Sequence, residues 1–236
     1  MSNSTGEAAP AWARAADSRT VTADAPAQDL CVAVIDDDDS IRFLVQTLLE
    51  RDGLRAQTYA SAEAFLEAYR PEALGCLVLD LHLPGMSGLQ MQEALNREGV
   101  DVPIIFFTAR GSVPKAVAAL KNGAVDFVEK PFDNKDLVRR IRESVAAETR
   151  RRAQGTACQA AAIRLASLTP REREVMDRMI VGCLSKNIAW DLGISIKTVE
   201  FHRSNIMQKV GVRSVAELVQ LTLTTRAGRT RLGEHA

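Results

Sequence analysis

Residues 31–45 read CVAVIDDDDSIRFLV, which joins a short apolar run to four consecutive aspartates and then to helical periodicity. The apolar run is short and partly β-branched, as in a buried strand, whereas Ile41, Leu44 and Val45 are spaced as on one helix face. Four adjacent carboxylates repel one another and destabilise a compact state unless a cation neutralises them. The stretch therefore predicts a strand, then a helix, with a candidate cation site at their junction.

The same alternation of β-rich runs and helical periodicity continues to about residue 150. Five βα units within about 120 residues are typical of a parallel sheet with helices on both faces. We therefore expect an α/β, doubly wound, five-stranded parallel sheet. Its expected strands are residues 31–36, 54–60, 75–81, 103–109 and 124–130.

Charge divides the chain into two halves of opposite sign. Residues 1–150 hold 16 Lys and Arg against 23 Asp and Glu, a net charge of −7, whereas residues 151–236 hold 14 against 7, a net charge of +7. An acidic half suits cations and a basic half suits nucleic acid, although a solvated basic surface is the alternative for the second half. Two domains with different partners are therefore expected.

The second half has helix punctuation and no β-rich run. Thr169, Pro170 and Glu172 form an N-cap, an N1 proline and a capping-box acid, and Ser214 with Glu217 repeats the box. Glycines stand where helices should stop. We expect an all-α bundle of about four helices here.

These patterns divide the chain into five segments. The first is rich in Ala, Ser, Thr and Pro and is too poor in apolar residues to offset the entropy of ordering. The expected segments are a disordered lead (1–28), an α/β domain (29–148), a partly helical linker (149–165), a helical domain (166–225) and a disordered tail (226–236).

Neither a membrane span nor a disulfide framework is expected. No apolar run approaches the roughly 18 residues that a span needs, and the N-terminus lacks the apolar region of a signal peptide. Cys31, Cys76, Cys158 and Cys183 form no CxxC pair, so we expect reduced, partly buried thiols. A cytoplasmic location is the expectation that fits these observations.

Chemically active residues stand at the ends of four expected strands. Asp36 and Asp37 end the first, Asp80 ends the third, Thr108 ends the fourth, and Lys130 follows the fifth. In a doubly wound parallel sheet the carboxyl ends of the strands carry the functional groups. Clustered carboxylates with room for water and phosphate are typical of a Mg²⁺ site, which would relieve the repulsion among the aspartates.

Some of these residues also have simpler interpretations. Asp38 and Asp39 precede the helix and suit capping and the helix dipole. Lys130 precedes Pro131 and could be a solvated turn lysine. Phe127 could be an ordinary strand-core residue.

Residues 31–150 resemble the receiver domain of bacterial two-component response regulators, which has a CheY-like fold. The resemblance rests on VIDDDDSIR, VLDLHLPGMSG, FFTAR and DFVEKPF, in the family's order and at its spacing. It implies that Asp80 accepts a phosphoryl group from a sensor histidine kinase. It also implies that Asp37, Asp80 and the backbone carbonyl of His82 bind Mg²⁺, with Asp36 acting through water.

The resemblance assigns further roles around Asp80. Lys130 would neutralise charge on the transferred group, and Thr108 would bond a phosphoryl oxygen while Phe127 rotates from exposed to buried. His82 and Arg110, two residues past Asp80 and Thr108, flank the site and could tune dephosphorylation.

In the basic half, residues 191–211 suggest a helix-turn-helix. Gly193 fits the bend, and Ser195 can cap the next helix. One face of that helix carries apolar residues that should pack, including Ile196, Val199, Ile206 and Val210. The other face is polar and basic and suits the major groove, the alternative being the wet face of a structural bundle.

Residues 165–224 are similar to the LuxR-type helix-turn-helix of the FixJ and NarL group, and the two halves together match the FixJ-like subgroup. The resemblance implies double-stranded DNA as a partner, with Glu200, Phe201 and Ser204 facing base edges. It also implies that five residues contact DNA phosphates: Lys186, Lys197, Thr198, Arg203 and Lys209.

Some residues of this domain have other interpretations. Thr198 and His202 could equally be hydrogen-bond partners within the domain. The helix that carries Val215, Leu218, Val219 and Leu221 resembles the family's dimerisation helix, but its apolar stripe could also be core.

We therefore expect a transcription regulator that dimerises and binds DNA when Asp80 is phosphorylated, with RNA polymerase as a further partner. Two rivals remain. A haloacid-dehalogenase-like phosphatase would also use an aspartyl phosphate, but it needs a second aspartate where His82 stands. The second rival is a binding module that acts by protein contact and has a degenerate DNA-binding domain. We expect a regulator and not an enzyme.

Overall fold

The computed structural model describes residues 30–70, 73–108 and 113–233, with the backbone alone for 113–116 and 226–233. The chain divides into a first unit, residues 1–152, and a second unit, residues 153–236. The expected disordered lead and Arg110 lie outside the described residues.

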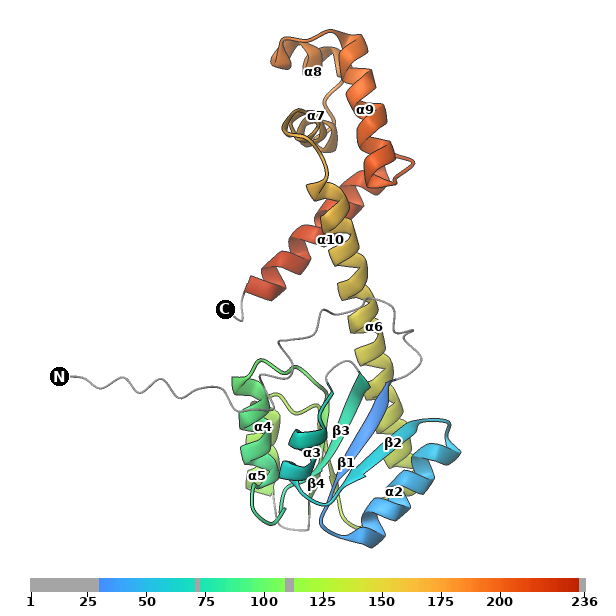
Figure 1. Ribbon diagram of the computed structural model, residues 1–236, viewed down its shortest axis with the longest axis vertical. Coiled ribbons are helices and arrows are strands. Elements are labelled where there is room, and N and C mark those ends of the chain that lie inside the picture. The colour runs from blue at the N-terminus through green and yellow to red at the C-terminus, as the bar shows by residue number, and fades with distance from the viewer. Residues whose placement is uncertain (1–29, 71–72, 109–112, 234–236) are drawn as a thin grey trace, which may run out of the picture. The chain divides into compact units, whose positions relative to one another are not determined.

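The first unit contains the expected five-stranded parallel sheet (Figure 1). The strand order is β2-β1-β3-β4-β5, so the order reverses at β1. The strands are β1 (Cys31–Ile35), β2 (Arg55–Tyr59), β3 (Leu74–Asp80), β4 (Ile104–Thr108) and β5 (Asp126–Glu129).

Helices cover both faces of this sheet, and the alternation of side chains along β1 shows why. Ala33 and Ile35 join one core with α3, α4 and α5, whereas Val32 and Val34 join the other with α2 and α6. The doubly wound α/β prediction is confirmed. The helices are α2 (Asp39–Arg51), α3 (Ala62–Ala68), α4 (Gly88–Arg97), α5 (Val113–Lys121) and α6 (Asn134–Ala166).

The predicted linker, residues 149–165, lies within α6, which is a single helix of 33 residues. Glu148 is buried on this helix between Arg151 and Arg152. Burial raises the pKa of Glu148, but the two arginines outweigh it and hold that pKa below its usual value. Arg152 also donates to the backbone oxygen of Leu74 at 2.6 Å, which fastens this turn of α6 to the start of β3.

The second unit contains the expected bundle of four helices. The end of α6 packs against the same core through Leu165. Its core contains Val175, Ile188, Val199, Ile206 and Leu218, all fully buried. The helices are α7 (Pro170–Ile180), α8 (Ser185–Leu192), α9 (Ile196–Val210) and α10 (Val215–Gly233). Helix α10 extends into the segment that the sequence suggested was disordered.

Local signals define the ends of these helices as predicted. Thr169 caps α7 in a capping box with Glu172, and Pro170 stands in the first turn. Gly193 and Gly211 end α8 and α9 with φ angles of +63° and +70°, a left-handed backbone that glycine adopts without a Cβ clash.

One expectation about α9 is wrong. Val199, Ile206 and Val210 are buried as predicted, but Ile196 is 54% exposed. Ile196 is the first residue of α9, where the helix begins beside the turn rather than against the core. None of the helices in the described ranges has the length and apolar composition needed to cross a membrane.

Candidate functional site

Three aspartates meet at the carboxyl end of the sheet. The parallel register pairs Ile35 with Leu79, so Asp36 and Asp80, one residue further along, lie side by side. With Asp37 they offer carboxylate oxygens that all lie within 4.8 Å of one another. Asp36 and Asp80 are buried, whereas Asp37 is exposed. The cluster expected from strand-end positions is therefore present.

Lys130 joins this cluster from the loop after β5. Its Nζ lies 2.6 Å from Asp36 Oδ2 and 2.5 Å from Asp80 Oδ2. Burial alone lowers the pKa of Lys130, but the hydrogen bonds to both aspartates outweigh it and raise that pKa. Lys130 is thus held as a cation between two carboxylates. This excludes the simpler interpretation of Lys130 as a solvated turn residue.

The two aspartates have further hydrogen bonds. Asp36 Oδ1 accepts from the N–H of Asp38 at 3.0 Å, and Asp80 Oδ1 accepts from the N–H of His82 at 2.9 Å. Burial raises the pKa of Asp36, although Lys130 and the Asp38 N–H favour its charged form. With Asp37, the cluster holds three carboxylates against one ammonium, so a further cation is favoured electrostatically.

The donor set fits a magnesium ion. Carboxylates are hard oxygen ligands, and an exposed one such as Asp37 leaves room for the waters that Mg²⁺ retains. The three carboxylates could hold a metal ion.

The remaining aspartates of the run lie at the start of α2, where Asp38 has the expected capping role and Asp39 suits the helix dipole. Asp38 is the N-cap of α2, and its side chain accepts from Ser40 N at 2.8 Å. That hydrogen bond holds the pKa of Asp38 below its usual value. Asp39 lies in the first turn and pairs with Arg42. The four aspartates therefore have different surroundings despite their identical chemistry.

Thr108 and two phenylalanines border the lysine. Thr108 is buried at the end of β4, and its backbone oxygen accepts from Lys130 N at 2.8 Å. The peptide bond from Lys130 to Pro131 is cis. Phe132 stacks on Phe107 with 5.0 Å between ring centroids, and Lys130 Nζ lies 5.5 Å from the centroid of Phe107. Aromatic packing thus holds the loop that carries Lys130.

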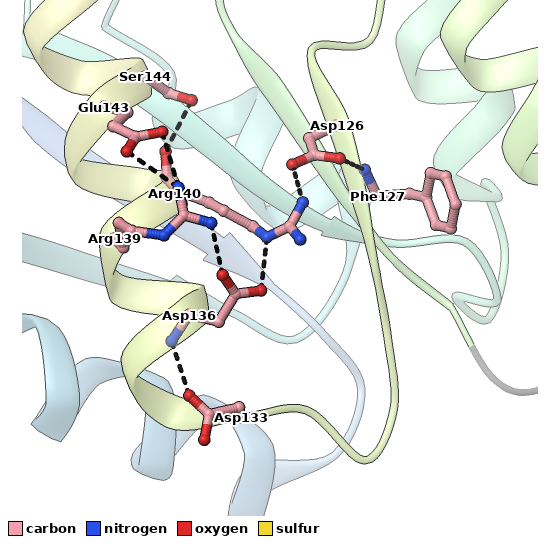
Figure 2. Close-up of polar contacts among 8 residues, drawn as sticks. All are labelled: Asp126, Phe127, Asp133, Asp136, Arg139, Arg140, Glu143 and Ser144. Carbon is pink, nitrogen blue, oxygen red and sulfur yellow. Dashed lines mark hydrogen bonds and ion pairs between the residues drawn. The ribbon is translucent and has the colours of Figure 1, made fainter.

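Phe127 does not belong to the strand core. It is 39% exposed, and its ring points away from the neighbouring ion pairs (Figure 2). Its backbone N–H donates to Asp126 at 2.8 Å, and Asp126 pairs with Arg140. Arg140 also donates to Asp136 at 2.7 Å. Phe127 is therefore not the ordinary core phenylalanine of the alternative, and its role as a switch residue stays a prediction.

Gly88 is a supporting residue that sequence reasoning missed. A Cβ at this position would lie 2.3 Å from the backbone oxygen of Asp80 and 3.1 Å from the Phe106 ring. Only glycine lets the start of α4 approach Asp80 so closely. The GMSG motif contains this residue, but the close contact depends on the packing of α4 against β3.

The predicted nucleic-acid face lies on α8 and α9. Phe201 is 62% exposed, and the side chains of Glu200 and Arg203 are 57% and 27% exposed. Lys186, Lys197 and Ser204 are exposed as well.

Three of the predicted phosphate contacts, Thr198, Arg203 and Lys209, also have partners within the domain. Thr198 shares a hydrogen bond with Ser195, 2.8 Å between their hydroxyl oxygens. Lys209 Nζ lies 2.8 Å from Glu172 Oε2, and this hydrogen bond holds the pKa of Glu172 below its usual value. The buried Nδ1 of His202 has no hydrogen-bond partner among the described residues.

The comparisons with known families agree with both units. Residues 32–142 match the family described as response regulator receiver domain, and residues 166–222 match the family of bacterial regulatory proteins of the luxR type.

Curated relatives match across both of these segments. The transcriptional regulatory protein FixJ of Azorhizobium caulinodans is 42% identical over 83% of this chain and 93% of the relative. FixJ of Bradyrhizobium diazoefficiens is 39% identical over 84% and 95%, respectively.

Solved structures agree as well. The response regulator StyR matches with a TM-score of 0.75 and 42% identity, over 82% of this chain and 98% of StyR. Full-length FixJ from B. japonicum matches with a TM-score of 0.52 and 37% identity, over 83% and 97%. The chain therefore belongs to the two-component response regulators of the FixJ-like group, with a receiver domain followed by a LuxR-type DNA-binding domain.

Proposed function

We propose that this response regulator is phosphorylated on Asp80 by a sensor histidine kinase, and that phosphorylation promotes dimerisation and sequence-specific DNA binding. The observation that carries the proposal is the contact of Lys130 with both Asp36 and Asp80 at the carboxyl end of the sheet. The protein would act on DNA in the cytoplasm, as a regulator and not as an enzyme with turnover.

In the phosphotransfer step, a carboxylate oxygen of Asp80 forms a bond to phosphorus. The bond from phosphorus to the kinase's histidine breaks, and its electron pair returns to the imidazole nitrogen. Lys130 already lies beside Asp80 Oδ2 and would offset the charge on the phosphoryl oxygens. The protein's contribution is thus positioning and electrostatics.

A magnesium ion would be held by Asp37, Asp80 and the backbone carbonyl of His82, with Asp36 acting through water. When bound, it would neutralise negative charge on the aspartates and on the incoming phosphoryl group.

The kinase would contact the first helix after β1. Phe43 is 73% exposed on α2, and Leu44 beside it is 38% exposed. Large apolar side chains exposed on the helix that follows Asp36 and Asp37 suit a protein partner that must approach Asp80. Residues 42–49 are therefore where we expect specificity for the cognate kinase.

The response to phosphorylation would pass through Thr108 and Phe127. Thr108 would move to bond a phosphoryl oxygen, and Phe127 would turn inward into the space that Thr108 vacates. This would shift a pre-existing equilibrium toward a form that dimerises through residues 114–123 and 126–130. Two DNA-binding domains would then bind a pseudo-palindromic site and present the dimer to RNA polymerase.

On DNA, Glu200, Phe201 and Ser204 would contact base edges and set sequence preference. Lys186, Lys197, Thr198, Arg203 and Lys209 would contact phosphates and set affinity and its salt dependence. The exposure of Phe201, at 62%, supports this assignment because it leaves the ring free to contact a base.

The test is phosphotransfer from a small phosphodonor with Mg²⁺, read by intact mass, in wild type and Asp80→Asn. Asp38→Asn is the matched control, because it changes an adjacent capping aspartate by the same chemistry. We expect one phosphoryl adduct in wild type and Asp38→Asn, and none in Asp80→Asn. An adduct that persists in Asp80→Asn would refute the assignment of Asp80.

The same samples would be used to select genomic DNA fragments and to measure mass by analytical ultracentrifugation. We expect phosphorylation to enrich particular fragments and to convert monomers to dimers. Equal fragment recovery with and without the adduct would mean a constitutive DNA binder. Monomers in both states would exclude the dimerisation step.

A further inference from the structure

Glu200 on the exposed face of α9 is held from the neighbouring helix by Ser185. The hydroxyl of Ser185 donates to Glu200 Oε1 at 2.5 Å. Ser185 is the first residue of α8, and the N-cap of that helix is Leu184, whose side chain makes no capping hydrogen bond. The Ser185 hydroxyl is one residue past the N-cap position, and its hydrogen bond goes to Glu200.

The other carboxylate oxygen of Glu200 faces an arginine at ion-pair distance. Arg203 Nε lies 3.7 Å from Glu200 Oε2, one turn further along α9. The Glu200 side chain is 57% exposed and that of Arg203 27%. The carboxylate is thus hydrogen-bonded at one oxygen and lies near a positive charge at the other, while it still faces solvent and has lone pairs left for another donor.

From this arrangement we propose that Ser185 is a positioning residue for sequence readout, which holds Glu200 in the orientation that accepts from the amino group of a cytosine. The inference rests on the proposed DNA binding by α9.

Chemistry favours cytosine as the base that Glu200 reads. A carboxylate only accepts hydrogen bonds, and cytosine presents its N4 amino donor in the major groove. Adenine presents an acceptor beside its amino donor, and guanine and thymine present acceptors that repel a carboxylate. Glu200 should therefore select for one base and against the others.

An unrestrained glutamate would provide this selection poorly. It loses rotamer freedom when it is ordered on binding, and it can swing away from an unsuitable base. The bond from Ser185 orders the side chain before DNA arrives, so that an unsuitable base meets a fixed carboxylate. Ser185 should consequently affect discrimination at one base position more than overall affinity.

The experiment is selection of binding sites from a random double-stranded library by the full-length, phosphorylated chain. The variants are Ser185→Ala, Ser185→Thr, which keeps the hydroxyl, and Glu200→Gln. Lys186→Ala is the matched control, because Lys186 follows Ser185 on α8 and is exposed. Circular dichroism would verify that each variant has the helicity of wild type.

We expect wild type to select cytosine at one position in each half-site and Glu200→Gln to lose that preference. Ser185→Ala should reduce it by about 5- to 10-fold, within the range for a single base contact, while other positions stay unchanged. Ser185→Thr should retain it, and Lys186→Ala should weaken binding equally for all sequences.

The result that overturns the inference is a Ser185→Ala profile identical to wild type, or a uniform loss at every position, which would show a purely structural role. A Glu200→Gln profile identical to wild type would overturn it as well. If wild type selects no sequence at all, the proposed DNA binding itself fails, and that outcome is distinct from a failure of Ser185.

Discussion

Lys130 and Asp80 are 50 positions apart in the chain, yet Lys130 Nζ lies 2.5 Å from Asp80 Oδ2. The same nitrogen contacts Asp36, so one lysine bridges the ends of β1 and β3. The arrangement places a fixed positive charge beside the oxygen that would carry a phosphoryl group.

Replacing Lys130 by Met should slow phosphorylation of Asp80 by about 100-fold, because loss of one preorganised charge donor to a transition state typically costs that much. The rate of adduct formation by intact mass, with the phosphodonor in excess, measures this effect. Lys135→Met, in the first turn of α6, is the control and should react at the wild-type rate. Equal rates in Lys130→Met and wild type would mean that Lys130 is only structural.

Replacing Asp37 by Asn should weaken Mg²⁺ binding by about tenfold or more, equivalent to at least about 1.4 kcal/mol. Asp37 is exposed and contributes an oxygen to the cluster with Asp36 and Asp80. Titration calorimetry with MgCl₂ measures the affinity. Asp39→Asn removes a nearby charge outside the cluster, and an equal loss in both variants would indicate a nonspecific charge effect.

Replacing Gly88 by Ala should destabilise the receiver domain by about 1–3 kcal/mol, the usual cost of overpacking. The new Cβ would lie 2.3 Å from the backbone oxygen of Asp80, which cannot move without disturbing β3. Urea denaturation followed by circular dichroism measures the change.

Gly155→Ala is the matched control, since a Cβ there would meet nothing within 4 Å and Gly155 lies inside α6. That change should stabilise its helix by about 0.5–1 kcal/mol. A Gly88→Ala protein as stable as wild type would contradict the close packing of α4 on Asp80.

The ion pair of Lys209 with Glu172 predicts a pH dependence of stability in the DNA-binding domain. Lys209 lowers the pKa of Glu172 in the folded state, so the pair stabilises above the ordinary pKa of about 4.5. That stabilisation should disappear as the pH falls through the lowered folded pKa.

Glu172→Gln keeps a capping acceptor but loses the charge. It should be less stable than wild type by about 1–2 kcal/mol at pH 7, and the difference should shrink toward pH 3. Urea denaturation of the full chain at several pH values measures it. A difference that does not change with pH would exclude the charged pair as its cause.

The lysines of the DNA-binding domain should differ in their effect on salt dependence. Lys186→Ala and Lys197→Ala should each reduce the slope of log affinity against log salt concentration by about 1, as expected for a lost phosphate contact. Lys209→Ala should change the slope less, because the ammonium of Lys209 is already paired with Glu172. Affinities measured at several salt concentrations test this, and three equal slopes would show that Lys209 exchanges its partner on DNA.

Much of the receiver site was predictable from local pattern. Parallel strands end at the same edge, so aspartates at the ends of β1 and β3 had to meet once their register aligned Ile35 with Leu79. The role of Lys130 was harder to predict, because a lysine before a proline also suits a solvated turn. Its contact with two carboxylates depends on the position of β5 beside β4.

The sequence by itself determined the α/β and helical domains, the helix caps at Asp38, Thr169 and Ser195, and the aspartates at the strand ends. These features depend on neighbours within a few residues or on hydrophobic periodicity. Only the tertiary structure decided the close approach of Gly88 to Asp80 and the hydrogen bond from Ser185 to Glu200. Both depend on how separate elements pack, and the distances between atoms that result are not encoded in any local pattern of residues.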